Sequence, residues 1–228
     1  LGGERLDDLG DRVRKLLGMM QGPPPGLLDK MRTLIDLIKM AGYQPKLVRA
    51  APCQEVTLTG PDADLNRIPI LKCWPMDAGR FITLPLVITR DPETGVRNVG
   101  TYRMQVYDGK TTGMHFHWHK DGARHLRKSK TPLQVAVAVG SDPALCFAAT
   151  LPLPPDVDEC LFAGLVRQES TKLIRAETVE IDVPANAEIV LEGTVDPVER
   201  RREGPFGDHT GYYSLDDEFP VFRINCIT

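Results

Sequence analysis

Arg97-Asn-Val-Gly-Thr-Tyr-Arg103 decides the fold, together with the histidine-rich run from Gly113 to Gly122 that follows it. The β-prone stretch from Arg80 to Arg90 comes before the first segment, and the turn residues between them predict an antiparallel pair of strands. Asp108-Gly109 is a hairpin signal, so we expect residues 111–119 to return as a strand beside the first segment. The two polar runs are therefore predicted to meet on neighbouring strands.

Strand and helix patterns continue along the rest of the chain. We expect further strands at 54–59, 173–183, 188–195, 133–140 and 220–227, and helices at 6–20, 27–40, 121–130 and 155–167. Several antiparallel strands interrupted by short helices are typical of a barrel or a strongly curved sheet. We predict an α+β fold, with this barrel or curved sheet over residues 61–228. An N-terminal helical segment and a connecting strand are predicted over residues 1–60.

Composition limits the classes of function. The 228 residues include 42% hydrophobic side chains, enough for a substantial core. Lys and Arg total 28 against 31 Asp and Glu, so the charge of −3 gives no case for nucleic acid or a membrane surface as partner. Five widely spaced cysteines without a C-x-x-C pair favour reduced thiols in a cytoplasmic protein. The first residues lack the apolar core of a signal peptide.

Three histidines stand at alternate positions in the second polar run. On a strand, His115, His117 and His119 would share one face, which suits contact with a metal or a phosphate. Imidazoles that are simply hydrogen-bonded on a sheet face explain the spacing equally well. Taken alone, Asn98 reads as a turn or bulge residue, and Arg103 as a structural ion-pair partner.

Two carboxylates flank the tight loop Glu203-Gly-Pro-Phe-Gly-Asp208. Glycine and proline hold such a loop stiff, and paired acids near an arginine suit proton transfer. A solvated acidic turn after the basic triplet Arg200–Arg202 is the alternative interpretation. Glu159 stands at the start of a predicted helix, where a first-turn carboxylate is favourable without any chemical role.

Four separated motifs in this order closely resemble the UbiD family of reversible decarboxylases. They are Asn98-Val-Gly-Thr-Tyr-Arg-Met-Gln105, Phe162-Ala-Gly-Leu165, Val183-Pro-Ala-Asn-Ala-Glu-Ile-Val-Leu-Glu-Gly193 and Glu203-Gly-Pro-Phe-Gly-Asp-His-Thr-Gly-Tyr-Tyr213. The resemblance runs from about Gln54 to the C-terminus. It implies a split antiparallel β-barrel that binds flavin over residues 61–228, with residues 1–60 as part of a larger α/β domain. It also implies the decarboxylation of an aromatic or α,β-unsaturated carboxylic acid with prenylated FMN.

The resemblance also implies a catalytic network. Arg103 matches the family arginine that orients the substrate carboxylate and pairs with Glu203. Asp208, or Glu203 through the network, would protonate the carbon that remains after CO2 leaves. Many relatives have Glu at the last position, and Asp shortens this acid by one methylene.

Metal and cofactor contacts follow from the same resemblance. Asn98, His119 and Glu159 match residues that hold a divalent ion, usually Mn2+, against the cofactor phosphate, and these are reasonable ligand types. A K+ ion is implied near the main-chain carbonyls of Ala148 and Ala149. The positions that match flavin-lining residues are Thr101, Tyr102, Arg103, His115, Phe116, His117, Lys120 and Asp121. Some relatives have Arg-Trp-Leu in place of His115-Phe-His117. In this chain, imidazole side chains would therefore make the contacts on the phosphate side of the cofactor.

Family members are longer than this chain. The resemblance therefore implies a cofactor-binding core that lacks the C-terminal domain, with a homo-oligomer as the full-length form and a prenyl-FMN synthase as the source of the cofactor. One alternative is an isolated flavin- and metal-binding module without turnover of its own. Another is a flavin reductase of related barrel architecture, although the chain contains no dinucleotide-binding fingerprint.

Overall fold

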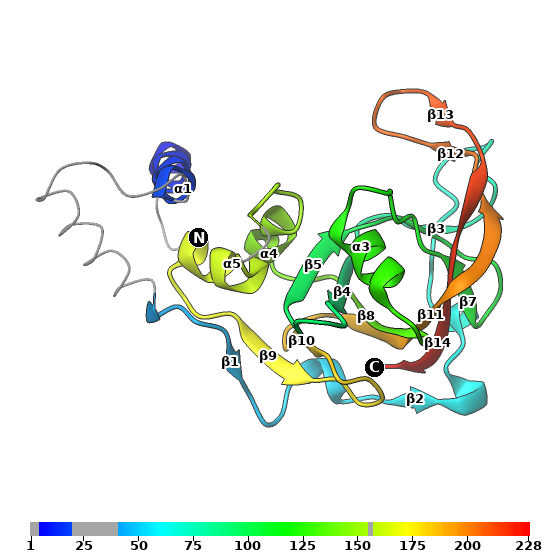
Figure 1. Cartoon of the computed structure of the whole chain (residues 1–228), viewed down its shortest axis with the longest axis horizontal. Coiled ribbons are helices and arrows are strands. Elements are labelled where there is room, and N and C mark those ends of the chain that lie inside the picture. Colours follow the sequence, from blue (N-terminus) through cyan, green and yellow to red (C-terminus); the bar gives the residue numbers. More distant parts are fainter. Residues whose placement is uncertain (1–4, 20–40, 155–156) are drawn as a thin grey trace, which may run out of the picture. The chain divides into compact units, whose positions relative to one another are not determined.

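The computed structural model describes residues 5–19, 41–154 and 157–228 (Figure 1). The predicted helix at 27–40 lies outside these residues. The chain packs as two compact units, a smaller one of Leu1–Lys46 with Pro143–Lys172 and a larger one of Leu47–Asp142 with Leu173–Thr228. The predicted domains, 1–60 and 61–228, stay a prediction. No helix of the described residues has the length and apolar character needed to cross a membrane.

The smaller unit contains three described helices, α1 (Leu6–Met19), α4 (Pro143–Ala148) and α5 (Glu159–Arg167). Arg12 of α1 donates from Nη1 to the carbonyl oxygen of Val166 in α5 (2.8 Å). Helix α5 begins at the N-cap Asp158, whose Oδ1 accepts the N–H of Cys160 (2.7 Å) and satisfies a free helix-end donor. The sequence did not predict α4, because six residues are too few for a helical period to show.

The remaining elements are mostly strands. They are β1 (Lys46–Leu47), β2 (Leu58–Thr59), β3 (Phe81–Ile82), β4 (Leu86–Arg90), β5 (Arg97–Thr101), β6 (Met104–Gln105), β7 (Thr111–Gly113), β8 (Leu133–Val139), β9 (Lys172–Arg175), β10 (Asp182–Pro184), β11 (Ile189–Glu203), β12 (Phe206–Gly207), β13 (Tyr213–Ser214) and β14 (Asp217–Ile227). Helix α3 spans Asp121–Lys128, and short 3-10 helices span Pro52–Gln54, Gly60–Asp62 and Leu65–Arg67.

The main sheet has seven strands in the order β2-β14-β11-β8-β4-β5, with β7 also paired to β14. Smaller sheets have the orders β1-β9-β10, β3-β6 and β12-β13. The strand pairs with a described register are antiparallel, and the α+β class is confirmed. Among the described residues, no pairing joins β2 to β5, so the strand pairings do not close the sheet into a barrel.

Several strand predictions differ from the structure in extent, and the run 54–59 forms a strand only at Leu58–Thr59. The run 80–90 divides into β3 and β4 around Pro85, which cannot donate to a ladder. The run 173–183 divides into β9 and β10, joined by a turn in which the N–H of Ala176 bonds to the carbonyl of Ile181 (2.9 Å). The run 188–195 instead continues to Glu203 through a register shift. This extension places Glu203 in a strand.

The predicted strand 111–119 is wrong beyond Gly113. Strand β7 ends there and pairs with β14 rather than with the strand that carries Asn98. The chain then turns, so that Phe116 enters the core and the N–H of Lys120 bonds to the carbonyl of His117 (3.0 Å). The chain leaves the strand at this turn, so the period-two spacing of the histidines does not place them along one sheet face.

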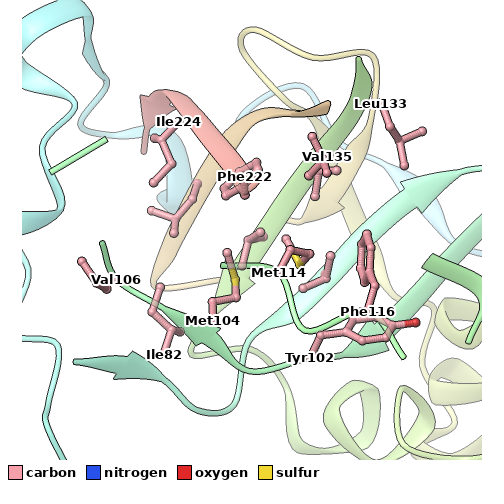
Figure 2. Close-up of a cluster of buried hydrophobic side chains, with 14 of the residues drawn as sticks. Ile82, Tyr102, Met104, Val106, Met114, Phe116, Leu133, Val135, Phe222 and Ile224 are labelled. Atoms are coloured by element: carbon pink, nitrogen blue, oxygen red, sulfur yellow. The ribbon is translucent and has the colours of Figure 1, made fainter. Parts of the chain in front are cut away.

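The hydrophobic core of the larger unit supports this turn (Figure 2). Phe222 on β14 and Val135 on β8 are fully buried, and α3 contributes Ala123 and Leu126 to the same cluster. At one side of the cluster, the rings of Tyr102 and Phe116 meet edge to face with centroids 4.9 Å apart. These rings are the chain neighbours of Arg103 and His115, so the core holds the backbone of the two polar runs.

Helix α3 is fixed to the β4–β5 turn by a buried acid. Asp91 Oδ1 accepts the N–H of Glu93 (2.9 Å), and Asp91 Oδ2 accepts Lys128 Nζ (2.7 Å). Burial alone would raise the pKa of Asp91, but the hydrogen bonds from Lys128, Glu93 and Thr94 outweigh it and lower the pKa to about 2. The acid therefore stays ionised and keeps α3 in place.

Replacing Phe222 with Ala tests the position of the core. The fully buried ring should leave a cavity, and we expect the free energy of unfolding to fall by about 3–5 kcal/mol. Urea denaturation measures this change. Leu84→Ala, at a side chain that is 77% exposed, is the control and should change stability by less than about 0.5 kcal/mol. Equal losses in both variants would contradict the assignment of the core.

Candidate active site

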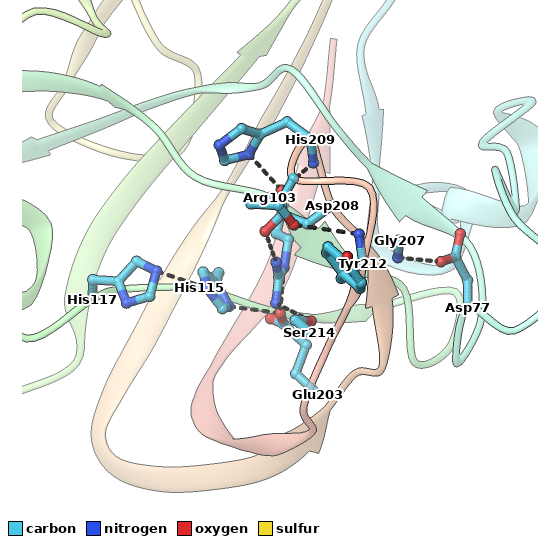
Figure 3. A network of polar contacts seen from close by, with 11 residues as sticks. Asp77, Arg103, His115, His117, Glu203, Gly207, Asp208, His209, Tyr212 and Ser214 are labelled. Atoms are coloured by element: carbon cyan, nitrogen blue, oxygen red, sulfur yellow. Dashed lines mark hydrogen bonds and ion pairs between the residues drawn. The ribbon is translucent and has the colours of Figure 1, made fainter.

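Arg103 lies in the break between β5 and β6 and contacts both acids of the 203–208 loop (Figure 3). Its Nε atom donates to Glu203 Oε1 (3.0 Å), Nη1 to Asp208 Oδ2 (3.4 Å) and Nη2 to Ser214 Oγ (3.1 Å). The guanidinium carbon also lies 4.7 Å from the centre of the Phe206 ring. The structure thus brings Arg103, Glu203 and Asp208 together, as the sequence predicted.

Glu203 is the last residue of β11 and its side chain is fully buried. Oε1 accepts the bond from Arg103 and also lies 2.7 Å from His115 Nδ1. Oε2 has no hydrogen-bond partner in the described part of the chain. The interpretation of this residue as part of a solvated acidic turn is therefore wrong. A buried carboxylate oxygen without a partner is costly, and such atoms often mark functional sites.

Gly113 makes room for the free oxygen of Glu203. A Cβ atom at this position would lie 2.9 Å from Glu203 Oε2 and 2.8 Å from Tyr107 Oη, closer than side chains tolerate. Burial and the negative charge of Glu203 raise the pKa of Tyr107 to about 12. Tyr107 therefore stays protonated, and its hydroxyl donates to the carbonyl of Arg201 (3.3 Å).

Asp208 has a more open environment, with a third of its side chain exposed. Its Oδ1 accepts both the backbone N–H (2.7 Å) and Nδ1 (2.8 Å) of His209. Burial acts to raise the pKa of Asp208, but the bonds from His209 and the charge of Arg103 outweigh it and lower the pKa. Arg103 therefore holds two different acids, one fully buried with a free oxygen and one that is ionised near neutral pH.

The three histidines meet through their rings rather than along a strand face. His115 Nε2 lies 3.1 Å from His117 Nε2, and the rings of His117 and His119 stack with centroids 6.1 Å apart. Burial, followed by the positive charges of neighbouring side chains, lowers the pKa of His117 and favours its neutral form. Within the described ranges, no three His, Cys, Asp or Glu side chains are placed to hold a metal ion together.

The predicted metal ligands occupy separate elements. Asn98 lies inside β5 opposite Thr89, so it is not a turn or bulge residue. Its side chain is buried, and its Nδ2 has no hydrogen-bond partner among the described residues. An amide end without a partner fits a ligand role, because a rotation exchanges the oxygen and nitrogen of the amide. His119 precedes α3, and Glu159 opens α5 in the smaller unit. Their convergence on one ion stays a prediction.

The predicted flavin-lining positions of the larger unit cluster around the ends of β5 and α3. Thr101 ends β5, Tyr102 accepts the N–H of Gly122 at its hydroxyl (3.3 Å), and Asp121 begins α3 after Lys120. Phe116, His117 and Trp118 line a pocket of about 430 Å3, whose other walls come from α3, β14 and Arg200 of β11. This volume is within the range of small-molecule sites. Ala148 ends α4 in the smaller unit, and Ala149 follows it.

Ser214 and Asp77 are among the residues of the site that were not predicted from the sequence. Ser214 reaches Arg103 because it pairs with Phe206 across the β12–β13 hairpin. Asp77 accepts the N–H of Gly207 at a separation of 130 residues. Neither residue has a local pattern that indicates its contact, although Ser214 directly follows the motif that ends at Tyr213.

Arg103 lies between two acids, Glu203 and Asp208. A guanidinium in this position can bind a carboxylate, and the neighbouring acids can transfer a proton. Residues 46–228 match the family model described as UbiD, 3-octaprenyl-4-hydroxybenzoate carboxy-lyase Rift-related domain. The chain belongs to the UbiD family, and the resemblance found in the sequence is confirmed.

Curated relatives extend this similarity but are longer. An uncharacterized protein of Archaeoglobus fulgidus is 51% identical over 229 residues, which cover 99% of this chain and 46% of the relative. One from Aquifex aeolicus is 45% identical, covering 100% of this chain and 47% of the relative. The chain thus spans about half the length of these relatives.

Solved structures include UbiD-class enzymes with the same fold. HmfF from Pelotomaculum thermopropionicum, in complex with FMN, is 33% identical with a TM-score of 0.78, covering 84% of this chain and 45% of that one. Vanillic acid decarboxylase from Sedimentibacter hydroxybenzoicus, in closed form, is 31% identical with a TM-score of 0.80. The match covers 89% of this chain and 45% of the decarboxylase chain.

Replacing Arg103 with Gln tests the electrostatic link within the site. Because the cation helps to keep Asp208 ionised, its loss should raise the pKa of this carboxyl. Carbon-13 NMR of the aspartate carboxyl groups across a pH titration measures the change. Arg127→Gln is the matched control, since Arg127 stacks on Trp118 and should leave Asp208 unchanged. An unchanged Asp208 pKa in Arg103→Gln would show that the two side chains are not coupled.

Proposed function

We propose that this chain carries the cofactor-binding and catalytic core of a UbiD-like carboxy-lyase. Its reaction is the reversible decarboxylation of an aromatic or α,β-unsaturated carboxylic acid with prenylated FMN. The observation that carries this proposal is the Arg103 guanidinium held between Glu203 and Asp208, with one oxygen of Glu203 buried and free. Similarity to vanillic acid decarboxylase and to HmfF bound to FMN supports it.

Arg103 is the proposed anchor for the substrate carboxylate. A guanidinium offers a planar fork of donors that matches a carboxylate, and here the fork is already oriented by Glu203 and Ser214. Its contact with Asp208 is the longest of the three, at 3.4 Å. An incoming carboxylate competes for this weakest contact, so binding requires little rearrangement of the buried part of the site.

Substrate binding also prepares the proton donor. Asp208 is ionised in the free site, partly because of Arg103. A second carboxylate beside the same guanidinium raises the pKa of Asp208, because like charges disfavour ionisation. Asp208 then takes up a proton and delivers it to the carbon atom that loses CO2. Glu203, through its free Oε2 and its contact with Arg103, is the alternative donor in the same network.

Prenylated FMN, when bound, supplies the acceptor for the electrons of the breaking carbon–carbon bond. We assign its contacts to Thr101, Tyr102, Arg103, His115, Phe116, His117, Lys120 and Asp121. Two of these eight residues, Phe116 and His117, line the pocket of about 430 Å3, which supports their part of the assignment. A split barrel around the flavin remains part of the proposal, supported by the branched pairing of β14 with β2, β7 and β11.

Metal ions complete the proposed cofactor site. Asn98, His119 and Glu159 would hold Mn2+ against the phosphate, and main-chain carbonyls near Ala148 and Ala149 would hold K+. The partnerless buried amide of Asn98 fits this role. A prenyl-FMN synthase as cofactor source and a homo-oligomer as the assembled form belong to the same proposal.

A second candidate is a flavin- and metal-binding module without turnover. The observation that favours it is that the chain spans 46% of the A. fulgidus relative and 45% of the HmfF chain. The flavin would then bind to this core, while the reaction would need residues from elsewhere.

Turnover with a panel of hydroxybenzoate and cinnamate acids separates the two candidates. We expect the protein reconstituted with prenylated FMN, Mn2+ and K+ to release CO2 and to exchange the new C–H hydrogen with deuterated water. Arg103→Ala, Glu203→Gln and Asp208→Asn should each lower kcat by about 100-fold or more, because each removes part of the carboxylate anchor or the proton path.

Glu55→Gln, at an exposed acid of the larger unit, is the control and should keep full activity. A wild-type protein that binds flavin without any CO2 release or exchange would favour the binding module. Turnover that survives all three site variants would contradict the proposed catalytic network.

Asn98→Ala tests the metal site without an activity measurement. Loss of an oxygen ligand should weaken Mn2+ binding by about tenfold or more. Metal content after dialysis, measured by plasma mass spectrometry, gives the comparison. Asn186→Ala, at an exposed amide, should bind Mn2+ like the wild type. Equal metal content in the two variants would remove Asn98 from the ligand set.

A further inference from the structure

Asp77 is a buried acid that lies outside the Arg103 network, with only 3% of its surface exposed. Its Oδ1 accepts the backbone N–H of Gly207 (2.7 Å), and its Oδ2 accepts that of Trp74 (2.9 Å). No Lys or Arg side chain of the described ranges pairs with it. Two backbone donors therefore satisfy the carboxylate, and one of them belongs to the loop that carries Asp208.

The segment around Asp77 makes three more contacts with this loop and its hairpin. The N–H of Ala78 donates to the carbonyl of Pro205 (2.9 Å), and the N–H of Met76 donates to Tyr213 Oη (3.3 Å). Trp74 packs directly on Gly207, where a Cβ atom would lie 2.5 Å from the indole ring. We call residues 74–78 the anchoring segment, because it contacts the loop immediately before Asp208.

The anchored residues are neighbours of the groups that contact Arg103. Gly207 precedes Asp208 in the chain and pairs with Tyr213, while Phe206 pairs with Ser214 and lies beneath the guanidinium. The position of the backbone at residues 205–207 therefore determines the positions of Asp208 and Ser214 relative to Arg103. The Arg103–Asp208 contact, at 3.4 Å, is already near the limit for a hydrogen bond, so a small displacement of the loop breaks it.

We propose that Asp77 is a positioning residue, which holds Asp208 against Arg103 by binding the N–H of Gly207. The Oδ1 atom of Asp77 accepts this bond at the residue immediately before Asp208, so the contact acts directly on the backbone that carries the acid. Asp77 does not touch Arg103 or either of its acids, so its influence passes through the backbone. The catalytic consequence of this inference rests on the proposed function, but the structural consequence does not.

The structural consequence is measured by NMR on the free protein. In Asp77→Ala, we expect the Gly207 amide to exchange with solvent about tenfold faster or more, because it loses its acceptor. The pKa of Asp208 should rise toward its ordinary value as the carboxyl moves from Arg103. Asp77→Asn keeps one oxygen acceptor, so its Gly207 exchange rate and Asp208 pKa should lie between those of the wild type and Asp77→Ala. This variant provides the test if Asp77→Ala is unstable.

Asp196→Asn is the matched control for these measurements. Asp196 Oδ1 also accepts two backbone N–H groups, from Val198 (2.7 Å) and Glu199 (3.0 Å), but it does not contact the loop at 203–208. This variant should leave both Gly207 exchange and the pKa of Asp208 unchanged. Unchanged values in the Asp77 variants as well would overturn the proposal.

The catalytic consequence is a lower kcat with little change in KM, measured on the protein reconstituted with the cofactor and metal ions. Misplacement of the proton donor should lower kcat by about tenfold in Asp77→Ala and less in Asp77→Asn, with KM changed by less than about twofold. Thermal unfolding curves establish that the variants are folded at the assay temperature. A kcat equal to that of the wild type would overturn the positioning role. If the wild type itself shows no turnover, the proposed function fails, and the NMR measurements still decide the role of Asp77.

Discussion

The contact of Arg103 with Glu203 is the interaction on which the site depends. Glu203 is fully buried, and an isolated carboxylate there would be strongly disfavoured. The guanidinium, itself only 10% exposed, supplies the opposite charge, while His115 supplies a second partner on the same oxygen. The fold places both side chains next to each other, so each charge has a partner. Truncating either side chain would leave the other charge buried and unpaired. Asp208 and Ser214 accept further hydrogen bonds from the same guanidinium.

The fold delivers these groups through irregularities in its strands. Arg103 stands where the chain breaks between β5 and β6, and Glu203 stands at the end of β11 beyond a register shift. Asp208 and Ser214 come from the β12–β13 hairpin, which begins directly after that strand. Regular ladders would direct these side chains alternately to opposite faces of a sheet. Breaks, shifts and a short hairpin instead turn four polar groups toward one point.

Much of this could be predicted from local patterns, and the exceptions have physical reasons. The pairing of β4 with β5, the α5 helix and the two-acid loop follow from apolar runs, an N-cap and turn residues. The strand predicted at 111–119 fails because the chain turns after Gly113, and the alternate spacing of the histidines gives no sign of this turn. Asp77 and Ser214 were missed because their contacts depend on the finished fold. The motif resemblance pointed to Arg103, Glu203 and Asp208 as a group. Composition alone favoured a solvated turn for the two acids and a structural ion pair for Arg103.

Membership of the UbiD family and the geometry of Arg103 lead to one central claim, that this guanidinium receives the carboxylate of the substrate beside a bound flavin. The most direct test is a crystal structure of the protein with prenylated FMN and an aromatic acid that binds without reacting. The claim predicts that the acid's carboxylate lies within hydrogen-bond distance of Arg103, with Glu203 and Asp208 on either side of the reacting carbon. Flavin and acid bound at a place from which Arg103 cannot be reached would contradict it.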